Sequence, residues 1–323
     1  MSRMLRASSL SSGTVGGMRY GAHLPLIDFA GQGWRPGGIA SYAAAARRLG
    51  YGTIAVNDHL VFQRPWLDGI VALASVVEAS GDLRLATTVS LPVVRGPAAL
   101  AKAAAALDIL SGGRLVLGVG PGSSGRDYEC AGLAFDERWP RFEESIRYLR
   151  AQLSAGAAPF EGRFYRTGPQ LEPRPDRAGG PPIWIASWGS DAGLRRVARL
   201  GDGWLASAYN ATPEHIASCR AKLARDGRQP DGFPCTLATM WTYVTGSSRE
   251  RGERLAELAA MLNRPAEQLA GQVLVGPAED CAAVVRAYAG AGVDQILIWP
   301  LAEAEDQLER FMRDVAPLVR SGA

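Results

Sequence analysis

The chain has 323 residues, 47% of them hydrophobic and 21% charged, so it is long and apolar enough to bury a large core without a disulfide or a metal. Its 35 basic and 32 acidic residues give a net charge of +3 and are mixed along the whole length, which argues against a nucleic-acid-binding protein. Four cysteines lie far apart with no C-x-x-C pair and no histidine at zinc spacing, which indicates a reduced, cytoplasmic protein without a metal site.

The first 17 residues, MSRMLRASSLSSGTVGG, contain no acid and no continuous apolar core of the kind a signal peptide needs. We interpret residues 1–17 as a flexible extension and residues 18–323 as one domain; Met18 is an alternative native start. No later segment approaches the run of about 18 apolar residues that a membrane span requires.

Short β-rich segments then alternate with helical ones, which is typical of repeated βα units and a parallel sheet. The expected strands are 20–24, 53–57, 84–89, 115–119, 182–186, 204–206, 237–244 and 295–299. The expected helices are 39–49, 66–79, 98–110, 138–153, 192–200, 213–226, 249–261, 279–289 and 306–319. Eight units favour a closed (β/α)8 TIM barrel over an open doubly wound sheet. Residues 155–180 and the link before the last strand, with helical residues at 264–271, are expected to be insertions.

The stretch LVLGVGPGSSGRDYECAG, beginning at Leu115, suggests a phosphate cradle because bare amides and hydroxyls follow a buried strand. It matches G-x-G-x-x-G, but the expected helical pattern resumes only near Arg138. It also frames a P-loop, but Arg126 and Asp127 stand where Lys and Ser/Thr belong. Both nucleotide-binding folds are therefore disfavoured.

Polar residues at the carboxyl ends of barrel strands are the candidates for chemistry. They are His23, Asp58, His59, residues 87–90, the Gly/Ser/Arg run after the fourth strand, and residues 187–191. His59 stands out because imidazole titrates near neutral pH. His215 falls within an outer helix and is expected at the surface.

The chain resembles the luciferase-like flavin and deazaflavin oxidoreductases. The matching segments are GYGTIAVNDHL, RLATTVSLPVVRGPAALAKAAAALDILSGGRLVLGVGPGSSGRDYECAGLAFDERWPRFEESI and PPIWIASWGSDAGLRRVARLGDGW. The resemblance implies a (β/α)8 barrel with the cofactor ring over strands two to four and its phosphate held by the loops after strands four and five. It also implies a small-molecule substrate, a homodimer and, as a partner, a flavin or F420 reductase.

Site residues follow from the same resemblance. The ring contacts are expected from Asp58, His59, Thr88 and Val89, and the phosphate contacts from Gly120, Pro121, Gly122, Ser123, Ser124, Arg126, Ser187, Trp188, Gly189 and Ser190. The catalytic residue is expected to be His59, as a proton donor or relay. A non-proline cis peptide is implied at Thr88–Val89.

Structural alternatives stay open at several of these positions. His59 is otherwise a capping or packing residue, and Thr88–Val89 an ordinary strand end. Arg126 is otherwise paired with Asp127 or Glu129 on the surface. The tryptophans near other strand ends either line an aromatic substrate pocket or belong to the core, and the core interpretation is favoured. They are Trp66, Trp188 and Trp299.

The favoured function is hydride transfer between coenzyme F420 and a small organic substrate. The rivals are an FMNH2-dependent monooxygenase fed by a reductase and a non-catalytic barrel that binds flavin or another ligand. Members that oxidise sugar phosphates carry a catalytic Glu where this chain has Ser123, which disfavours that activity.

Overall fold

A computed structural model describes residues 14–15 and 17–321. The strands are β1 Thr14–Val15, β2 Met18–His23, β3 Thr53–Val56, β4 Arg84–Ser90, β5 Leu115–Val119, β6 Ile183–Ala186, β7 Gly203–Ser207, β8 Cys235–Val244, β9 Leu274–Gly276 and β10 Gln295–Pro300. The expected extension at 1–17 lies mostly outside the described residues. Thr14 and Val15 correct that expectation in part, because they pair antiparallel with Arg19 and Met18.

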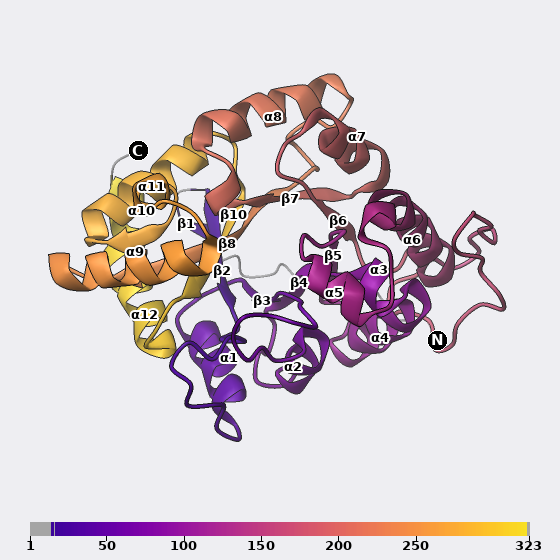
Figure 1. The fold of residues 1–323 in the computed structure, drawn as a ribbon, viewed down its shortest axis with the longest axis horizontal. Coiled ribbons are helices and arrows are strands. Elements are labelled where there is room, and N and C mark those ends of the chain that lie inside the picture. Colours follow the sequence, from indigo (N-terminus) through magenta and orange to yellow (C-terminus); the bar gives the residue numbers. More distant parts are fainter. Residues whose placement is uncertain (1–13, 16, 322–323) are drawn as a thin grey trace, which may run out of the picture.

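Eight parallel strands close into a barrel in the order β2, β3, β4, β5, β6, β7, β8 and β10. The pairing of β10 with β2, and of β2 with β3, completes the ring (Figure 1). The predicted TIM barrel is therefore confirmed. β9 adds to the barrel by pairing with β8, and it was not anticipated because its three residues, LVG, carry too short a pattern.

Helices surround the barrel, and Figure 1 shows them outside the ring of strands. They are α1 Gly38–Arg48, α2 Gly69–Ser75, α3 Pro92–Arg95, α4 Pro97–Leu110, α5 Gly125–Cys130, α6 Arg138–Leu153, α7 Asp191–Leu200, α8 Pro213–Arg225, α9 Ser248–Leu262, α10 Ala266–Leu269, α11 Ala278–Gly290, α12 Ala304–Arg310 and α13 Ala316–Ser321. Short 3-10 turns occupy Phe135–Glu137 and Ala208–Asn210, and a π-helical turn, Phe311–Val315, joins α12 to α13.

The apolar strand runs form the barrel because both of their faces are covered, one by helices and one by the barrel interior. All five residues of β5, LVLGV, are buried. Gly118 in this strand has no room for a side chain, since a Cβ would overlap the carbonyl oxygen of Thr87. Dense packing of neighbouring strands thus requires glycine at that position.

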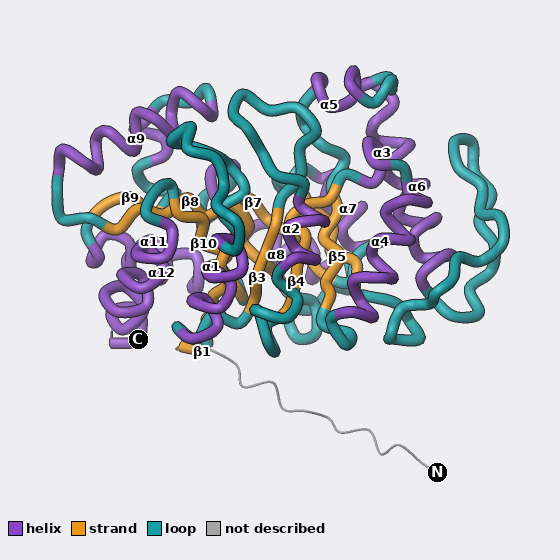
Figure 2. The backbone as a smooth tube through the Cα atoms, turned by 90° about the horizontal axis from the view of Figure 1, so that it is seen from below, coloured by secondary structure: helices purple, strands orange, loops and turns teal. Residues whose placement is uncertain are grey.

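The carboxyl ends of the strands open on the face away from β1. In Figure 2, α5 and α9, which follow β5 and β8, lie at that end of the barrel. One expectation about this face was wrong: helix resumes at Gly125, directly after the glycines, and not only at Arg138. A local helix start therefore does not separate this loop from a dinucleotide-binding loop, whereas the closed barrel does.

The two predicted insertions are present. Residues 155–180 form an irregular segment anchored by Glu144, whose carboxylate accepts hydrogen bonds from the amides of Arg163, Phe164 and Tyr165. The link from β8 to β10 carries α9, α10, β9 and α11. Within the described ranges, no helix combines the length and apolar character needed to cross a membrane.

Candidate active site

The end of β3 connects two neighbouring strand ends. Asn57 follows Val56, and its Oδ1 accepts hydrogen bonds from the amide of Asp58 at 2.8 Å and from the amide of Val89 at 3.0 Å. Asn57 therefore fixes the turn that carries Asp58 and His59 against the end of β4.

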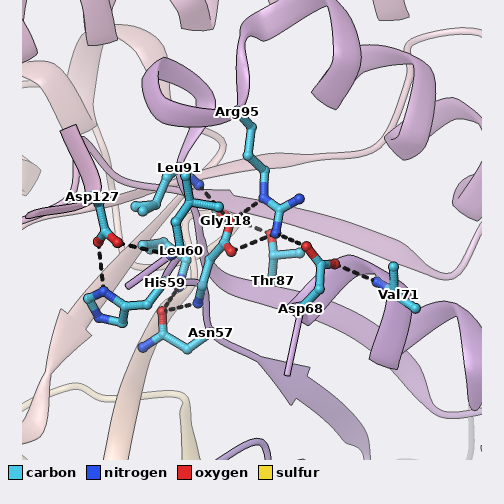
Figure 3. Close-up of polar contacts among 12 residues, drawn as sticks. Asn57, His59, Leu60, Asp68, Val71, Thr87, Leu91, Arg95, Gly118 and Asp127 are labelled. Carbon is cyan, nitrogen blue, oxygen red and sulfur yellow. Dashed lines mark hydrogen bonds and ion pairs between the residues drawn. The ribbon is translucent and has the colours of Figure 1, made fainter. Parts of the chain in front are cut away.

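His59 is oriented by Asp127 of α5 (Figure 3). Its Nδ1 lies 2.8 Å from Asp127 Oδ2, while Asp127 Oδ1 accepts from the amides of Leu60 and Val61, each at 2.9 Å. Burial raises the pKa of the Asp127 carboxyl, but the hydrogen bonds from His59, Val61 and Leu60 outweigh this and hold that pKa below its usual value. The carboxylate is ionised and can only accept, so His59 Nδ1 carries a proton and Nε2 of the neutral ring is a free base.

That free nitrogen has the exposure a proton-transfer group needs. His59 Nε2 has no partner among the described residues, and the side chain is 19% exposed. The interpretation of His59 as a cap of α2 does not hold, because Asp68 is that cap and accepts from the amide of Val71.

The Asp58 side chain contacts Arg95, whereas the resemblance implied a contact with the cofactor ring. Its carboxylate is buried and forms a two-pronged ion pair with Arg95, with Nη2 to Oδ1 at 2.7 Å, and Arg95 also bonds Asp68. Burial alone would lower the pKa of Arg95, but the ion pairs with Asp58 and Asp68 outweigh burial and raise this pKa above its ordinary value. The guanidinium therefore stays charged. The Asp58 side chain is thereby committed to holding the loop.

The implied cis peptide is present between Thr88 and Val89. The Thr88 hydroxyl lies 3.2 Å from the carbonyl oxygen of Val56 and 3.1 Å from Nε2 of His23. The pairing of β4 with β5 shifts register between Thr87 and Ser90, so the segment departs from the regular ladder at this point.

The glycine-rich loop after β5 presents donors that have no partners. The amides and hydroxyls of Ser123 and Ser124 bond no described residue, and the exposed Arg126 forms no ion pair within residues 14–15 and 17–321. Asp127 faces His59 instead of Arg126. A free cation beside free hydroxyls and amides suits an anionic group such as a phosphate.

Backbone geometry shapes the start of the same loop. A Cβ at Gly120 would lie 3.0 Å from Val89 Cγ2 and 3.4 Å from the Cβ of Ala186, so glycine lets three strand ends meet. Gly122 has a φ of 81°, which favours glycine, and Pro121 accepts a hydrogen bond from the Tyr128 hydroxyl.

The loop after β6 lies beside it, because β5 and β6 pair directly. Ser187 Oγ accepts from the amide of Gly189, and Ser190 Oγ caps α7 by accepting from the amide of Gly193. Trp188 is 56% exposed, and its carbonyl oxygen lies 3.0 Å from Nε2 of His215. Both hydroxyls keep their protons for a further acceptor.

Aromatic rings fill the barrel mouth next to His59. The edge of Trp66 meets His59 at a centroid distance of 4.8 Å and Trp299 at 5.6 Å, and Trp299 stacks on Trp241 and on His23. Trp66 and Trp299 therefore belong to one cluster at the strand ends, whereas Trp188 lies apart on the surface.

The structure thus gathers most of the predicted residues at three adjacent strand ends. Sequence reasoning missed Asn57, Arg95 and Asp127, which orient the site. All three residues stand beside a candidate residue or within one of the segments quoted above. The sequence shows only that a polar residue lies near a strand end, and it does not show which side chain that residue contacts. The described residues contain no group of three His, Cys, Asp or Glu arranged to hold a metal ion.

A TIM barrel with a histidine and a loop of unpartnered donors at the carboxyl ends of its strands has the arrangement of a barrel enzyme. The chain belongs to the luciferase-like monooxygenase family, whose model matches residues 28–261.

Known proteins resemble the chain over most of its length. The F420-dependent glucose-6-phosphate dehydrogenase of Kineococcus radiotolerans is 27% identical, over 88% of this chain and 94% of that protein. The crystal structure of a monooxygenase from Streptomyces bottropensis superposes with a TM-score of 0.79 at 21% identity, over 93% of this chain and 99% of the other. An F420-dependent secondary alcohol dehydrogenase in complex with an F420-acetone adduct gives 0.79 at 17% identity, over 94% and 99%.

Proposed function

We propose that the chain uses coenzyme F420 to transfer a hydride to or from a small organic substrate. The observation that carries the proposal is His59, whose Nδ1 is held by ionised Asp127 and whose Nε2 has no partner among the described residues. The name of the Kineococcus relative, F420-dependent, supports the choice of cofactor.

The residues at the strand ends have the chemistry to hold such a cofactor. The unpartnered donors at Ser123, Ser124 and Arg126 suit its phosphate, with Ser187 and Ser190 as further donors from the adjacent loop. The turn at His59 and the bulge at Thr88–Val89 would contact the ring, as the resemblance implies. Bound deazaflavin would supply a carbon that exchanges hydride with the substrate.

His59 would supply or accept the proton. With Nδ1 committed to Asp127, the neutral ring accepts a proton at Nε2, and the ionised carboxylate stabilises the imidazolium that results. The neutral ring would accept the proton of an alcohol that is oxidised, and the imidazolium would give that proton to the carbonyl oxygen of a substrate that is reduced.

The same donor set would also hold the phosphate of FMN, and the fold is shared with a monooxygenase structure. The alternative is therefore an FMNH2-dependent monooxygenase that receives reduced flavin from a reductase. The homodimer and the cytoplasmic location remain predictions from the sequence.

Titration of the purified protein with F420 and with FMN tests the proposal. We expect the Kd for F420 to be at least tenfold lower, a difference of about 1.4 kcal/mol. Equal or reversed affinities would favour the monooxygenase, and binding of neither cofactor would refute both enzyme functions. His59→Ala should then keep cofactor affinity within a few-fold and lower kcat by roughly 10²–10⁴. An early-melting His59→Ala variant with the wild-type rate of hydride transfer would instead mark His59 as a packing residue.

A further inference from the structure

Arg19 and Arg84 lie at the amino ends of β2 and β4, on the inner face of the barrel. Residues two apart in a strand share a face. Arg84 is two residues before Ala86, which packs in a cluster with residues of β5, β6 and β7. Arg19 is two residues before Gly21, where a Cβ would overlap the side chain of Leu297, and Leu297 packs with residues of β3 and β8. Side chains of strands that are not neighbours in the ring meet in the barrel interior, so both arginines begin on that face.

A third arginine reaches the same end of the barrel from the inserted segment before β6. Nη2 of Arg177 donates to the carbonyl oxygen of Leu115, the first residue of β5, and to the carboxylate of Asp108. Because β4 pairs with β5 at Leu115, Arg177 lies beside the start of β4. Nε of Arg177 is buried and has no partner among the described residues. We call Arg19, Arg84 and Arg177 the arginine triad.

The arginine triad carries three positive charges and has one carboxylate as a partner. Asp108 pairs with Arg177. The side chains of Arg19 and Arg84 are half-buried, and neither forms an ion pair or a hydrogen bond within residues 14–15 and 17–321. Burial and the charges of Arg19 and Arg177 lower the pKa of Arg84, and no carboxylate of the described chain opposes them. The residues before Thr14 contain no Asp or Glu that could supply the missing charge.

The other carboxylates close to these strand starts do not neutralise the triad. Asp294, just before β10, lies 3.9 Å from Arg220, and Asp82, just before β4, lies 3.6 Å from Arg47. Asp176 is exposed and forms no ion pair within the described ranges. Two of the three guanidinium groups therefore remain without a counter-charge.

This arrangement suits an oxoanion. Charged groups that are partly withdrawn from water destabilise a fold unless an opposite charge or hydrogen-bond acceptors compensate them. A phosphate accepts from several N–H groups at once and matches the planar fork of a guanidinium, whereas a chloride ion has no pair of oxygens to offer. One phosphate among three arginines would supply both the missing charge and the missing acceptors.

We propose that the arginine triad binds a phosphate-type oxoanion at the amino end of the barrel. The site is separate from the proposed cofactor site: β1, which pairs with Arg19, lies at the opposite end of the barrel from α5, which contains Arg126 (Figure 2). The inference therefore goes beyond the proposed function and does not depend on the cofactor. Free inorganic phosphate and a phosphate monoester offer the same chemistry, and separate probes distinguish them.

Calorimetric titration of the full chain carrying Arg126→Ala tests the inference, because this substitution removes the anion contact expected at the other end of the barrel. We expect saturable binding of inorganic phosphate. At a phosphate concentration of ten times the Kd, the Tm should rise by roughly 2 °C, whereas sodium chloride at the same ionic strength should give no such rise. Glucose 6-phosphate is the second probe. Binding of both probes assigns the site to phosphate groups in general, and binding of inorganic phosphate alone assigns it to the free ion.

Arg84→Gln in the same background removes one charge of the triad. It should weaken phosphate binding roughly ten- to hundredfold and abolish the phosphate-dependent rise in Tm. Arg225→Gln makes the same change of charge at the exposed end of α8, and as the matched control it should alter neither quantity. If Arg84→Gln does not fold, Arg19→Gln replaces it with the same expected result.

Three results would overturn the inference: no saturable phosphate binding by the Arg126→Ala variant, equal stabilisation by phosphate and chloride, or an unchanged phosphate Kd in the triad variants. Water alone would then solvate the triad. Failure of F420 and FMN to bind would leave this inference intact, since the triad contributes no residue to the proposed cofactor site.

Discussion

Asp127→Asn should change the protonation of His59 while keeping the loop in place. Asp127 Oδ1 accepts from the amides of Leu60 and Val61, and Oδ2 contacts His59 Nδ1. In the variant, the amide oxygen can keep both backbone bonds only if the NH2 group faces His59. Nδ1 must then accept, and the proton of the neutral ring moves to Nε2.

The expected effect on activity is larger than the effect on folding. The lost charge-assisted bond should lower the free energy of unfolding by about 1.5–3 kcal/mol, since Asp127 is fully buried. With Nε2 already protonated, His59 cannot accept a proton from substrate, so kcat for oxidation should fall by roughly 10²–10⁴. Cofactor affinity should change little, because Arg126 and the loop serines keep their positions.

The assay combines urea unfolding, F420 titration and single-turnover hydride transfer on the same preparation. Glu129→Gln is the matched control, since it makes the same change of charge on an exposed residue of the same helix. A variant that loses stability but transfers hydride at the wild-type rate would refute the assignment of the proton to His59 Nε2. A loss of cofactor affinity equal to the loss of rate would show that the loop itself had moved.

Three further perturbations follow from the described contacts. Arg126→Ala should weaken cofactor binding by about 1.5–3 kcal/mol and leave a phosphate-free ring analogue unaffected, with exposed Arg166→Ala as the control; equal losses for both ligands would contradict the phosphate contact. His23 has a folded-state pKa of about 3 against an ordinary 6.5, so the unfolded chain binds the proton first as the pH falls, and stability should drop by about 2 kcal/mol between pH 7 and pH 5. Urea unfolding at the two pH values measures this, and His23→Gln should lack that contribution. Gly118→Ala would overlap a backbone carbonyl oxygen of β4 and should lower the free energy of unfolding by about 1–3 kcal/mol or more, whereas Gly168→Ala, with open space around it, should not.

The barrel was predictable because its strands are continuous apolar runs and its helices follow at regular intervals. LVLGV at β5 shows why, since a strand buried on both faces has to be apolar throughout. The short elements were not predictable. The residues PVVR of α3 and LVG of β9 are too few to show a period, and tertiary packing decides their conformation.

The sequence was enough to predict several residues of the site, but not the contacts between them. His59 and the glycine-rich loop could be identified because strand ends meet at one face of a barrel. His59 and Asp127 are 68 residues apart, and Asp58 and Arg95 are 37 residues apart. Their pairing depends on the directions of side chains in the folded barrel, which the local sequence spacing does not reveal. The buried indole nitrogens of Trp241 and Trp299, which have no partner among the described residues, are likewise a property of packing alone.

Asp127 belongs to the short helix that contains Arg126, and it bonds the loop that carries His59. One rigid segment therefore touches both the anion-binding position and the imidazole. By thermodynamic reciprocity, the factor by which a bound anion changes the proton affinity of His59 equals the factor by which protonation of His59 changes the anion affinity. The carboxylate thus couples occupancy of the phosphate position to the readiness of the proton acceptor, and anion affinity should itself depend on pH.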